Sequence, residues 1–135
     1  MLVFSGMEIS LLEASPAEAG LLTDLVVDAF AEEAARYHHA PPGYDSVERR
    51  REAMAHGVRY FKIMLDGEAV GVISGTPRGQ DCRIGVAAVK LALQGRGIGS
   101  AALRLVEKEF PGVKRFFLET PSASLRNRHV YGKLG

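Results

Sequence analysis

Residues 91–107 read LALQGRGIGSAALRLVE and contain three glycines at alternating positions, Gly95, Gly97 and Gly99. They stand between an apolar run and a second apolar run that has helical spacing. Because glycine is disfavoured in a helix by roughly 1 kcal/mol relative to alanine, three of them at a helix start need an explanation. The backbone N–H groups at a helix start bind anions, and glycines let a phosphate come close to them. The stretch therefore predicts a pyrophosphate site with Arg96 as a further contact, and a flexible turn is an equally good interpretation of the residues alone.

The common nucleotide-binding motifs do not match this stretch. A P-loop would end in Gly-Lys followed by Ser or Thr, and residues 91–107 lack that triplet. A dinucleotide fingerprint has Gly-x-Gly-x-x-Gly after the first strand, whereas these glycines follow the fourth predicted strand. An anion held by this stretch would therefore lie in a different structural context.

The composition is that of a single domain with balanced charge. The chain has 135 residues, of which 47% are hydrophobic, and 17 basic residues nearly balance 16 acidic ones. The net charge of +1 gives no reason to expect nucleic acid or a membrane surface as a partner. The first ten residues lack the basic start of a signal peptide, so we expect none there, and no apolar run approaches the ~20 residues of a membrane helix. Cys82 is the only cysteine and forms no internal disulfide, so we expect a cytoplasmic protein.

Hydrophobic periodicity and turn signals predict an alternating order of strands and helices. Ser15, Pro16 and Glu18 form a capping box that starts a helix, and Asp66–Gly67 is a two-residue hairpin turn. The order β-α-α-β-β-β-α-β-α predicts an α/β fold with helices on the faces of a mixed sheet. We expect residues 7–135 to form one domain, preceded by an extension at residues 1–6. The predicted elements are strand 7–14, helix 16–37, a charged helix capped by Ser46 and ending near 56–57, strands 58–65, 68–75 and 82–91, helix 99–110, strand 114–121 and helix 122–134.

Two stretches resemble one protein family. VAAVKLALQGRGIGSAALRLVE, residues 86–107, resembles the acyl-CoA-binding core of the GNAT-type N-acetyltransferase superfamily, in which Gln/Arg-x-x-Gly-x-Gly/Ala opens a helix after a strand. Gln94, Gly97 and Gly99 fill those positions. FFLETPSASLRNRHVYGKLG, residues 116–135, is similar to the family's fifth strand, fourth helix and closing Tyr-x-Lys-Leu-Gly. The order of the predicted elements matches the family as well.

The resemblance implies a GNAT-like fold and an acetyltransferase reaction. The chain would move an acetyl group from acetyl-CoA to a primary amine of a small molecule or a peptide, with no metal ion. Tyr131 would protonate the departing CoA sulfur, since a phenol has a pKa of about 10, whereas spacing alone favours a packing residue of an amphipathic helix. The implied CoA contacts are Val89 and Leu91 for the pantetheine arm, Gln94, Gly95, Arg96, Gly97, Ile98, Gly99 and Ser100 for the pyrophosphate, and Asn127.

Several roles stay open at this level. Asn127 stands four residues before Tyr131, whereas the family often has asparagine seven before, where this chain has Ser124, and helix capping is the alternative for either residue. The fourth strand, CRIGVAAV, contains no carboxylate, so the general base is either Glu119 or a water relay. The first helices of this fold line the acceptor site, which by analogy makes specificity residues of Tyr37, His38, Tyr44 and Arg49 to Arg51.

The sequence departs from the family pattern at its end. The family continues with a phenylalanine and two more strands, whereas this sequence stops at Gly135. The strand at 114–121 would then have an open edge, which an incomplete chain, a second copy in a homodimer or a reduced fold would each explain. This departure leaves a second function open, that of a non-catalytic acyl-CoA-binding or regulatory module without a complete acceptor site.

Overall fold

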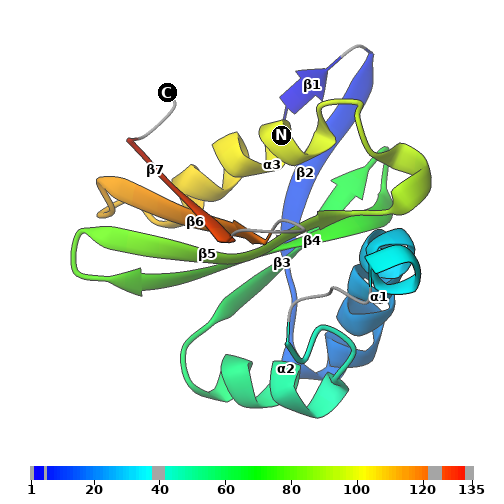
Figure 1. Cartoon of the computed structure of the whole chain (residues 1–135). Coiled ribbons are helices and arrows are strands. Elements are labelled where there is room, and N and C mark those ends of the chain that lie inside the picture. The colour runs from blue at the N-terminus through cyan, green and yellow to red at the C-terminus, as the bar shows by residue number, and fades with distance from the viewer. Residues whose placement is uncertain (1, 5, 38–41, 122–125, 133–135) are drawn as a thin grey trace.

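The structure is a computed structural model that describes residues 2–4, 6–37, 42–121 and 126–132. Its centre is a seven-stranded sheet in the order β1-β2-β3-β4-β5-β6-β7, antiparallel except between β5 and β6. Helices α1 and α2 cover one face and α3 covers the other (Figure 1). None of the described helices is both long and apolar enough to cross a membrane. The elements are β1 (Leu2–Phe4), β2 (Met7–Glu13), η1 (Pro16–Glu18), α1 (Ala19–Tyr37), α2 (Val47–Ala55), β3 (Arg59–Leu65), β4 (Glu68–Arg78), β5 (Asp81–Val89), η2 (Leu91–Leu93), α3 (Ile98–Val106), η3 (Glu107–Glu109), β6 (Arg115–Pro121) and β7 (Arg126–Gly132).

Each face of the sheet buries its own apolar cluster. On one face, α3 contributes Ile98, Ala102 and Val106, which recur at four-residue steps and therefore share one side of the helix. On the other face, α1 contributes Leu22 and Val26 with the same spacing. The sheet is thus covered on both sides by helices whose apolar stripes were visible in the sequence.

Three local predictions are confirmed. Asp66 and Gly67 have positive φ angles of 49° and 86° in the turn between β3 and β4, as a two-residue hairpin requires. Ser46 caps α2, because its side-chain oxygen accepts a hydrogen bond of 3.1 Å from the backbone N–H three residues later. The backbone N–H of Ser15 donates to the carboxylate of Glu18 at 3.1 Å, which is one half of the predicted capping box.

The predicted helix over residues 122–134 is wrong where the structure describes this segment. Residues 126–132 form β7, which pairs antiparallel with β6. The edge of β6 offers a row of backbone groups that need partners. The segment RNRHVYG contains Val130 and Tyr131, which favour a strand, and Gly132, which is unfavourable within a helix. The edge that we expected to be open is therefore paired within the chain. Residues 122–125 and 133–135 lie outside the described residues.

The N-terminal boundary also differs from the prediction. Leu2–Phe4, expected to lie in an extension before the fold, pair with Met7–Ile9 as β1 at one edge of the sheet. Gly6, with a positive φ of 77°, lies in the short connection between the two strands. The apolar residues of this segment favour a strand, but three residues are too short a run to predict one from the sequence.

β5 and β6 separate before either strand ends. Their parallel pairing stops at Ile84 and Leu118, whereas β5 continues to Val89 and β6 to Pro121. The pairing of β5 with β4 is irregular at the same level, opposite Ser74. A β-bulge bends the strand that contains it and increases its twist, which turns β5 away from β6. In the part of the chain that the structure describes, the second half of β5 therefore has an open edge in the middle of the sheet.

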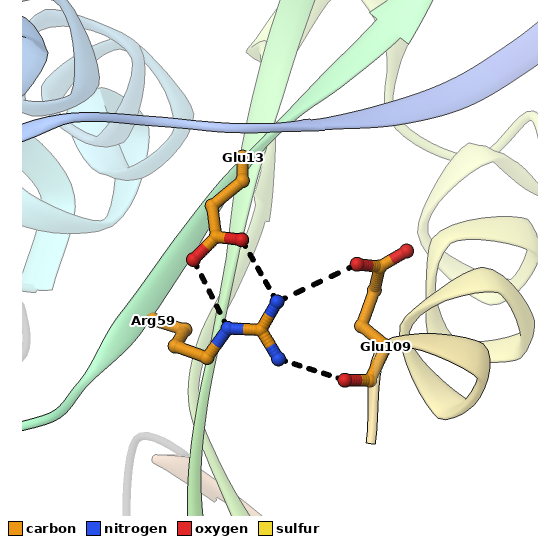
Figure 2. Close-up of polar contacts among 3 residues, drawn as sticks. All are labelled: Glu13, Arg59 and Glu109. Atoms are coloured by element: carbon orange, nitrogen blue, oxygen red, sulfur yellow. Dashed lines mark hydrogen bonds and ion pairs between the residues drawn. The ribbon is translucent and has the colours of Figure 1, made fainter. Parts of the chain in front are cut away.

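Arg59, the first residue of β3, connects β3 to Glu13 on β2 and to Glu109 at the end of η3 (Figure 2). Its guanidinium donates hydrogen bonds of 3.0 and 2.8 Å to the two carboxylate oxygens of Glu13, and one of 2.7 Å to the backbone C=O of Glu109. The guanidinium carbon also lies 5.0 and 4.8 Å from the ring centroids of Phe61 and Phe110. The hydrogen bonds from Arg59 hold the pKa of Glu13 below its usual value.

We expect Arg59→Met to lower the free energy of unfolding by about 2 kcal/mol at neutral pH, because it removes charged hydrogen bonds and both ring contacts. A carboxyl group with a lowered pKa in the folded state stabilises that state only while it is ionised. The difference between the wild type and Arg59→Met should therefore shrink as the pH falls below about 4.3, the pKa of glutamate in an unfolded chain. Urea unfolding of both proteins at neutral and acidic pH measures this difference, and a difference independent of pH would contradict the role of Glu13.

Candidate functional site

The open edge of β5 presents backbone groups in the middle of the sheet. The N–H groups of Val86 and Lys90 donate hydrogen bonds of 3.0 and 2.9 Å to acceptors on β4. Successive residues of a strand point their N–H and C=O groups to opposite sides. Those of Ala87 and Val89 therefore point away from β4, toward the side from which β6 has separated.

The glycine-rich turn opens the start of α3. Gly95 and Gly97 have positive φ angles of 79° and 83°, which glycine adopts without strain. The N–H of Ala101 donates to the C=O of Gly97 at 3.1 Å, so the N–H groups of the three residues before Ala101 have no acceptor within the helix. A Cβ atom added at Gly99 would meet only the side chain of Val89, at 4.0 Å. The space in front of these N–H groups is therefore open.

Hydrogen bonds join this turn to α1. The N–H of Leu91 donates to the carboxylate of Asp28 at 2.9 Å. The side-chain amide of Gln94 donates to the C=O groups of Ala29 and Val89, at 3.1 and 2.9 Å. These bonds hold the second half of α1 beside the end of β5, and they occupy the Leu91 N–H and the Val89 C=O.

A cavity of about 380 Å³, which we call the glycine cavity, lies between α1, the end of β5 and the start of α3. Its volume is within the range of roughly 300–1,000 Å³ that is typical of small-molecule sites. It brings together seven of the residues predicted to contact CoA, whereas Leu91 and Arg96 do not line it and their predicted contacts stay predictions. Its lining residues are Ala29, Phe30, Glu33, Ala87, Ala88, Val89, Leu93, Gln94, Gly95, Gly97, Ile98, Gly99 and Ser100.

A second cavity, of about 410 Å³, lies between α1, α2 and the bulged part of β5. We call it the arginine cavity, because Arg49, Arg50 and Arg83 line it. The two cavities have three lining residues in common, so they meet on one side of α1. The residues that they share are Phe30, Glu33 and Ala87.

Only some of the residues predicted to determine acceptor specificity line a cavity. Arg51 pairs with Glu48 at 2.8 Å and lines neither cavity. The side chain of Tyr37 and all of His38 lie outside the described residues. The arginine cavity is lined by the other three of these residues, Tyr44, Arg49 and Arg50.

Glu33 is the carboxylate at the junction of the two cavities, and it was not among the residues predicted from the sequence. It follows Ala29 by four residues, so it shares the face of α1 that Gln94 holds against β5. It forms no ion pair with another described residue. In the run AEEAARY it is indistinguishable from a solvated helix face, although its spacing of three and seven residues from Phe30 and Val26 places it on the apolar stripe.

Cys82, on β5, is buried in the core. Burial raises the pKa of its thiol to about 11. The thiol is therefore protonated at neutral pH, and Cys82 is not an activated nucleophile.

The backbone register places Tyr131 apart from the junction of the cavities. Tyr131 lies opposite Phe116 on β6, and Phe116 pairs with Cys82 near the beginning of β5. Ala87 marks the junction and lies further along β5. Nothing in this geometry tests the roles predicted for the side chains of Glu119, Asn127 and Tyr131, which stay predictions.

Comparison with known proteins agrees with this architecture. The model of the acetyltransferase (GNAT) family matches residues 22–135. No curated protein matches the sequence.

Solved structures with the same fold include an acetyltransferase from Thermus thermophilus, with a TM-score of 0.69 and 23% identity over 89% of this chain and 79% of that chain. The PaiA N-acetyltransferase from Thermoplasma acidophilum, in complex with coenzyme A, has a TM-score of 0.66 and 14% identity over 84% and 79% of the two chains. An aminoglycoside acetyltransferase in complex with coenzyme A has a TM-score of 0.63 and 15% identity over 87% and 78%. The fold matches all three structures, the family model spans most of the sequence, and the chain therefore belongs to the GNAT acetyltransferase family.

Proposed function

We propose that the protein is an N-acetyltransferase that moves an acetyl group from acetyl-CoA to a primary amine by direct attack. The meeting of two cavities carries this proposal. The glycine cavity has the open N–H groups of a helix start, and it joins the arginine cavity at Glu33 and Ala87. A donor site and an acceptor site that share one carboxylate provide the proximity that transfer between two bound substrates requires. The family match over residues 22–135 supports the same reaction class.

The residues of the glycine cavity fit CoA. The pyrophosphate would lie at the start of α3, where N–H groups and the helix dipole favour an anion and the missing Cβ of Gly99 leaves space. The pantetheine arm would follow the open edge of β5. There, both backbone groups of Ala87 and the N–H of Val89 can pair with its amides as a neighbouring strand would. Acetyl-CoA supplies the activated acetyl group, which this path brings to the junction of the cavities.

Glu33 is the proposed general base. Amines are mostly protonated at neutral pH and must lose a proton before they attack a carbonyl carbon. Glu33 lines both cavities, so its carboxylate can hold the ammonium group of the acceptor and accept the proton. The amine nitrogen then bonds to the acetyl carbon, the C–S bond breaks, and the sulfur leaves with the electron pair. The nitrogen loses its second proton as the amide forms, and the departing sulfur takes up one proton, so the step balances. Because Cys82 is buried and protonated, it does not carry the acetyl group, which favours direct attack.

Tyr131→Phe tests the predicted proton donor to the CoA sulfur. For a residue with this role, we expect the substitution to lower kcat by about 100-fold and to leave the affinity for acetyl-CoA unchanged. Tyr131, on β7, has its backbone opposite Phe116 on β6, away from the junction of the cavities. The roles proposed for Glu33 and the glycine cavity therefore do not depend on this residue. A kcat equal to that of the wild type would remove Tyr131 from the mechanism and leave protonation of the sulfur to water.

The proposed function is tested first by calorimetric titration with acetyl-CoA, with CoA and ADP as controls. We expect acetyl-CoA to bind at least about tenfold more tightly than ADP, because the edge of β5 adds hydrogen bonds to the pantetheine arm. Thiol release with a panel of primary amines then measures transfer. Binding without transfer to any amine would instead support a non-catalytic acyl-CoA-binding module. A folded chain that does not bind acetyl-CoA would contradict both functions.

A further inference from the structure

We propose that the acceptor amine also carries a carboxylate, and that Arg50, with Arg49 and Arg83, binds this carboxylate in the arginine cavity. The inference rests on the proposed function and names the substrate class of the same site. The acceptor is then a small amino carboxylate, with its ammonium group at Glu33 and its carboxylate at the arginines.

Arg50 is a buried cation with unused hydrogen-bond donors. The residue is 7% exposed, and its Nη1 donates to the hydroxyl of Thr23 at 2.8 Å and to the C=O of Tyr44 at 3.2 Å. The ring of Tyr60 lies 5.6 Å from the guanidinium carbon. The Nε atom is buried without a hydrogen-bond partner, and Nη2 has no partner among the described residues. One edge of the guanidinium is thus used for packing α2 against α1, and the other edge is unused.

The charge of Arg50 has no counter-charge among the described side chains. A buried charge without a partner lowers the stability of the folded state, which is why removing one partner of a buried ion pair destabilises proteins strongly. Arg50 lines the arginine cavity, so an anion in this cavity can supply the missing charge. Two parallel N–H groups of a guanidinium match the two oxygens of a carboxylate, which makes a carboxylate the best-fitting anion.

Arg49 and Arg83 add positive charge to the same cavity, and Gly43 leaves room for the side chain of Arg49. A Cβ atom at Gly43 would lie 2.6 Å from Cδ and 2.8 Å from Nη1 of Arg49. Neither arginine forms an ion pair with a described residue. Among the described residues that line the cavity with these three cations, Glu33 is the sole carboxylate.

This distribution of charge selects against other amines. A polyamine would place a second cation among the three arginines, where like charges repel. An amine without a carboxylate would leave the buried charge of Arg50 unpaired. An amino carboxylate satisfies both ends, because its ammonium group meets Glu33 and its carboxylate meets the arginines.

The test compares acceptors that differ only in the carboxylate. For a set of amino acids, kcat/KM is measured beside that of the matching carboxamide and of the decarboxylated amine. We expect kcat/KM to be at least about tenfold higher for the acid, since a charged hydrogen bond to a buried arginine is lost in the other two. Equal values for acid and carboxamide would overturn the inference while the observed transfer upholds the proposed function. A preference for peptides over free amino acids would also overturn it, and binding of acetyl-CoA without any transfer would overturn both.

Substitutions of the arginines test which of them cause the preference for the acid over the carboxamide. Arg50→Lys keeps the charge and loses the planar fork, so we expect KM for the acid to rise about tenfold while KM for the carboxamide and the affinity for acetyl-CoA stay unchanged. If Arg50→Lys does not fold, the double variant Arg49→Gln, Arg83→Gln changes two exposed residues, and it should lower the preference for the acid as well. Arg51→Gln, outside both cavities, is the control. Weaker binding of acetyl-CoA by the double variant would assign these arginines to the CoA site and overturn the inference.

Discussion

Gly99→Asp is expected to lower the affinity for acetyl-CoA by about 100-fold while the protein stays folded. The glycine cavity includes Gly99, and only the side chain of Val89 would touch an added Cβ atom. The new carboxylate would lie beside the pyrophosphate, and two unit charges 4 Å apart near a protein surface repel by about 4 kcal/mol, more than the roughly 2.7 kcal/mol that a 100-fold loss requires. A carboxylate in the first turn is favourable for a helix, so the stability of α3 is kept. Calorimetry gives the affinity, and urea unfolding gives the stability.

Two matched variants separate charge from shape. Gly99→Ala fills the same space without charge. We expect it to weaken binding by about tenfold and to raise the free energy of unfolding by up to about 1 kcal/mol, because alanine favours a helix. Gly112→Asp adds the same charge at a glycine with nothing within 4 Å of an added Cβ atom, and it should leave the affinity unchanged. An affinity of Gly99→Asp equal to that of the wild type would show that the pyrophosphate does not lie at the start of α3.

Glu33→Gln is expected to lower kcat/KM for the acceptor by about 100-fold or more, the usual contribution of a general base. Glutamine keeps the shape of the side chain and donates or accepts hydrogen bonds, but it does not take a proton from an ammonium group. Acetyl-CoA should bind as it does to the wild type, because the backbone groups proposed to hold it are unchanged. Initial rates over a range of acceptor concentrations, together with calorimetry, measure both quantities.

The choice of acceptor and a neighbouring variant serve as controls for Glu33→Gln. An acceptor whose amine has a low pKa arrives unprotonated, so the deficit of the variant should shrink with such an acceptor. Glu32→Gln makes the same change of charge one residue away, outside both cavities, and should keep nearly full activity. A deficit that does not depend on the pKa of the amine would contradict proton removal by Glu33 and leave it a role in holding the acceptor.

Much of the fold follows from local signals that act over a few residues. Asp66–Gly67 specify their turn because both residues adopt positive φ, and Ser46 starts α2 because its oxygen meets a backbone N–H within the first turn. The glycine turn before α3 was predicted for a similar reason, since the positive φ angles of Gly95 and Gly97 are properties of single residues and their nearest neighbours.

The missed features depend on contacts between distant residues. The helix predicted over residues 122–134 rested on the spacing of Leu125, Val130 and Leu134. The strand at 126–132 forms because β6 offers an unpaired edge, which is not a property of the segment itself. Glu33 looks like an ordinary member of a charged helix in the sequence, and Arg50 was expected at the acceptor site only by analogy with the fold. Their position at the cavities depends on how α1 and α2 pack against β5. That packing is set by contacts between residues far apart in the sequence, such as the hydrogen bond from Gln94 to Ala29.

The hydrogen bonds that link Leu91 and Gln94 to α1 have a thermodynamic consequence for the two substrates. The turn that would hold the donor and the helix that carries Glu33 are connected by Asp28 and Ala29, so a ligand that fixes one also restricts the other. Coupling of this kind is reciprocal: the factor by which the donor raises the affinity for the acceptor equals the factor by which the acceptor raises the affinity for the donor. We therefore expect each substrate to bind more tightly when the other is already bound, because the first has already restricted the shared turn and helix.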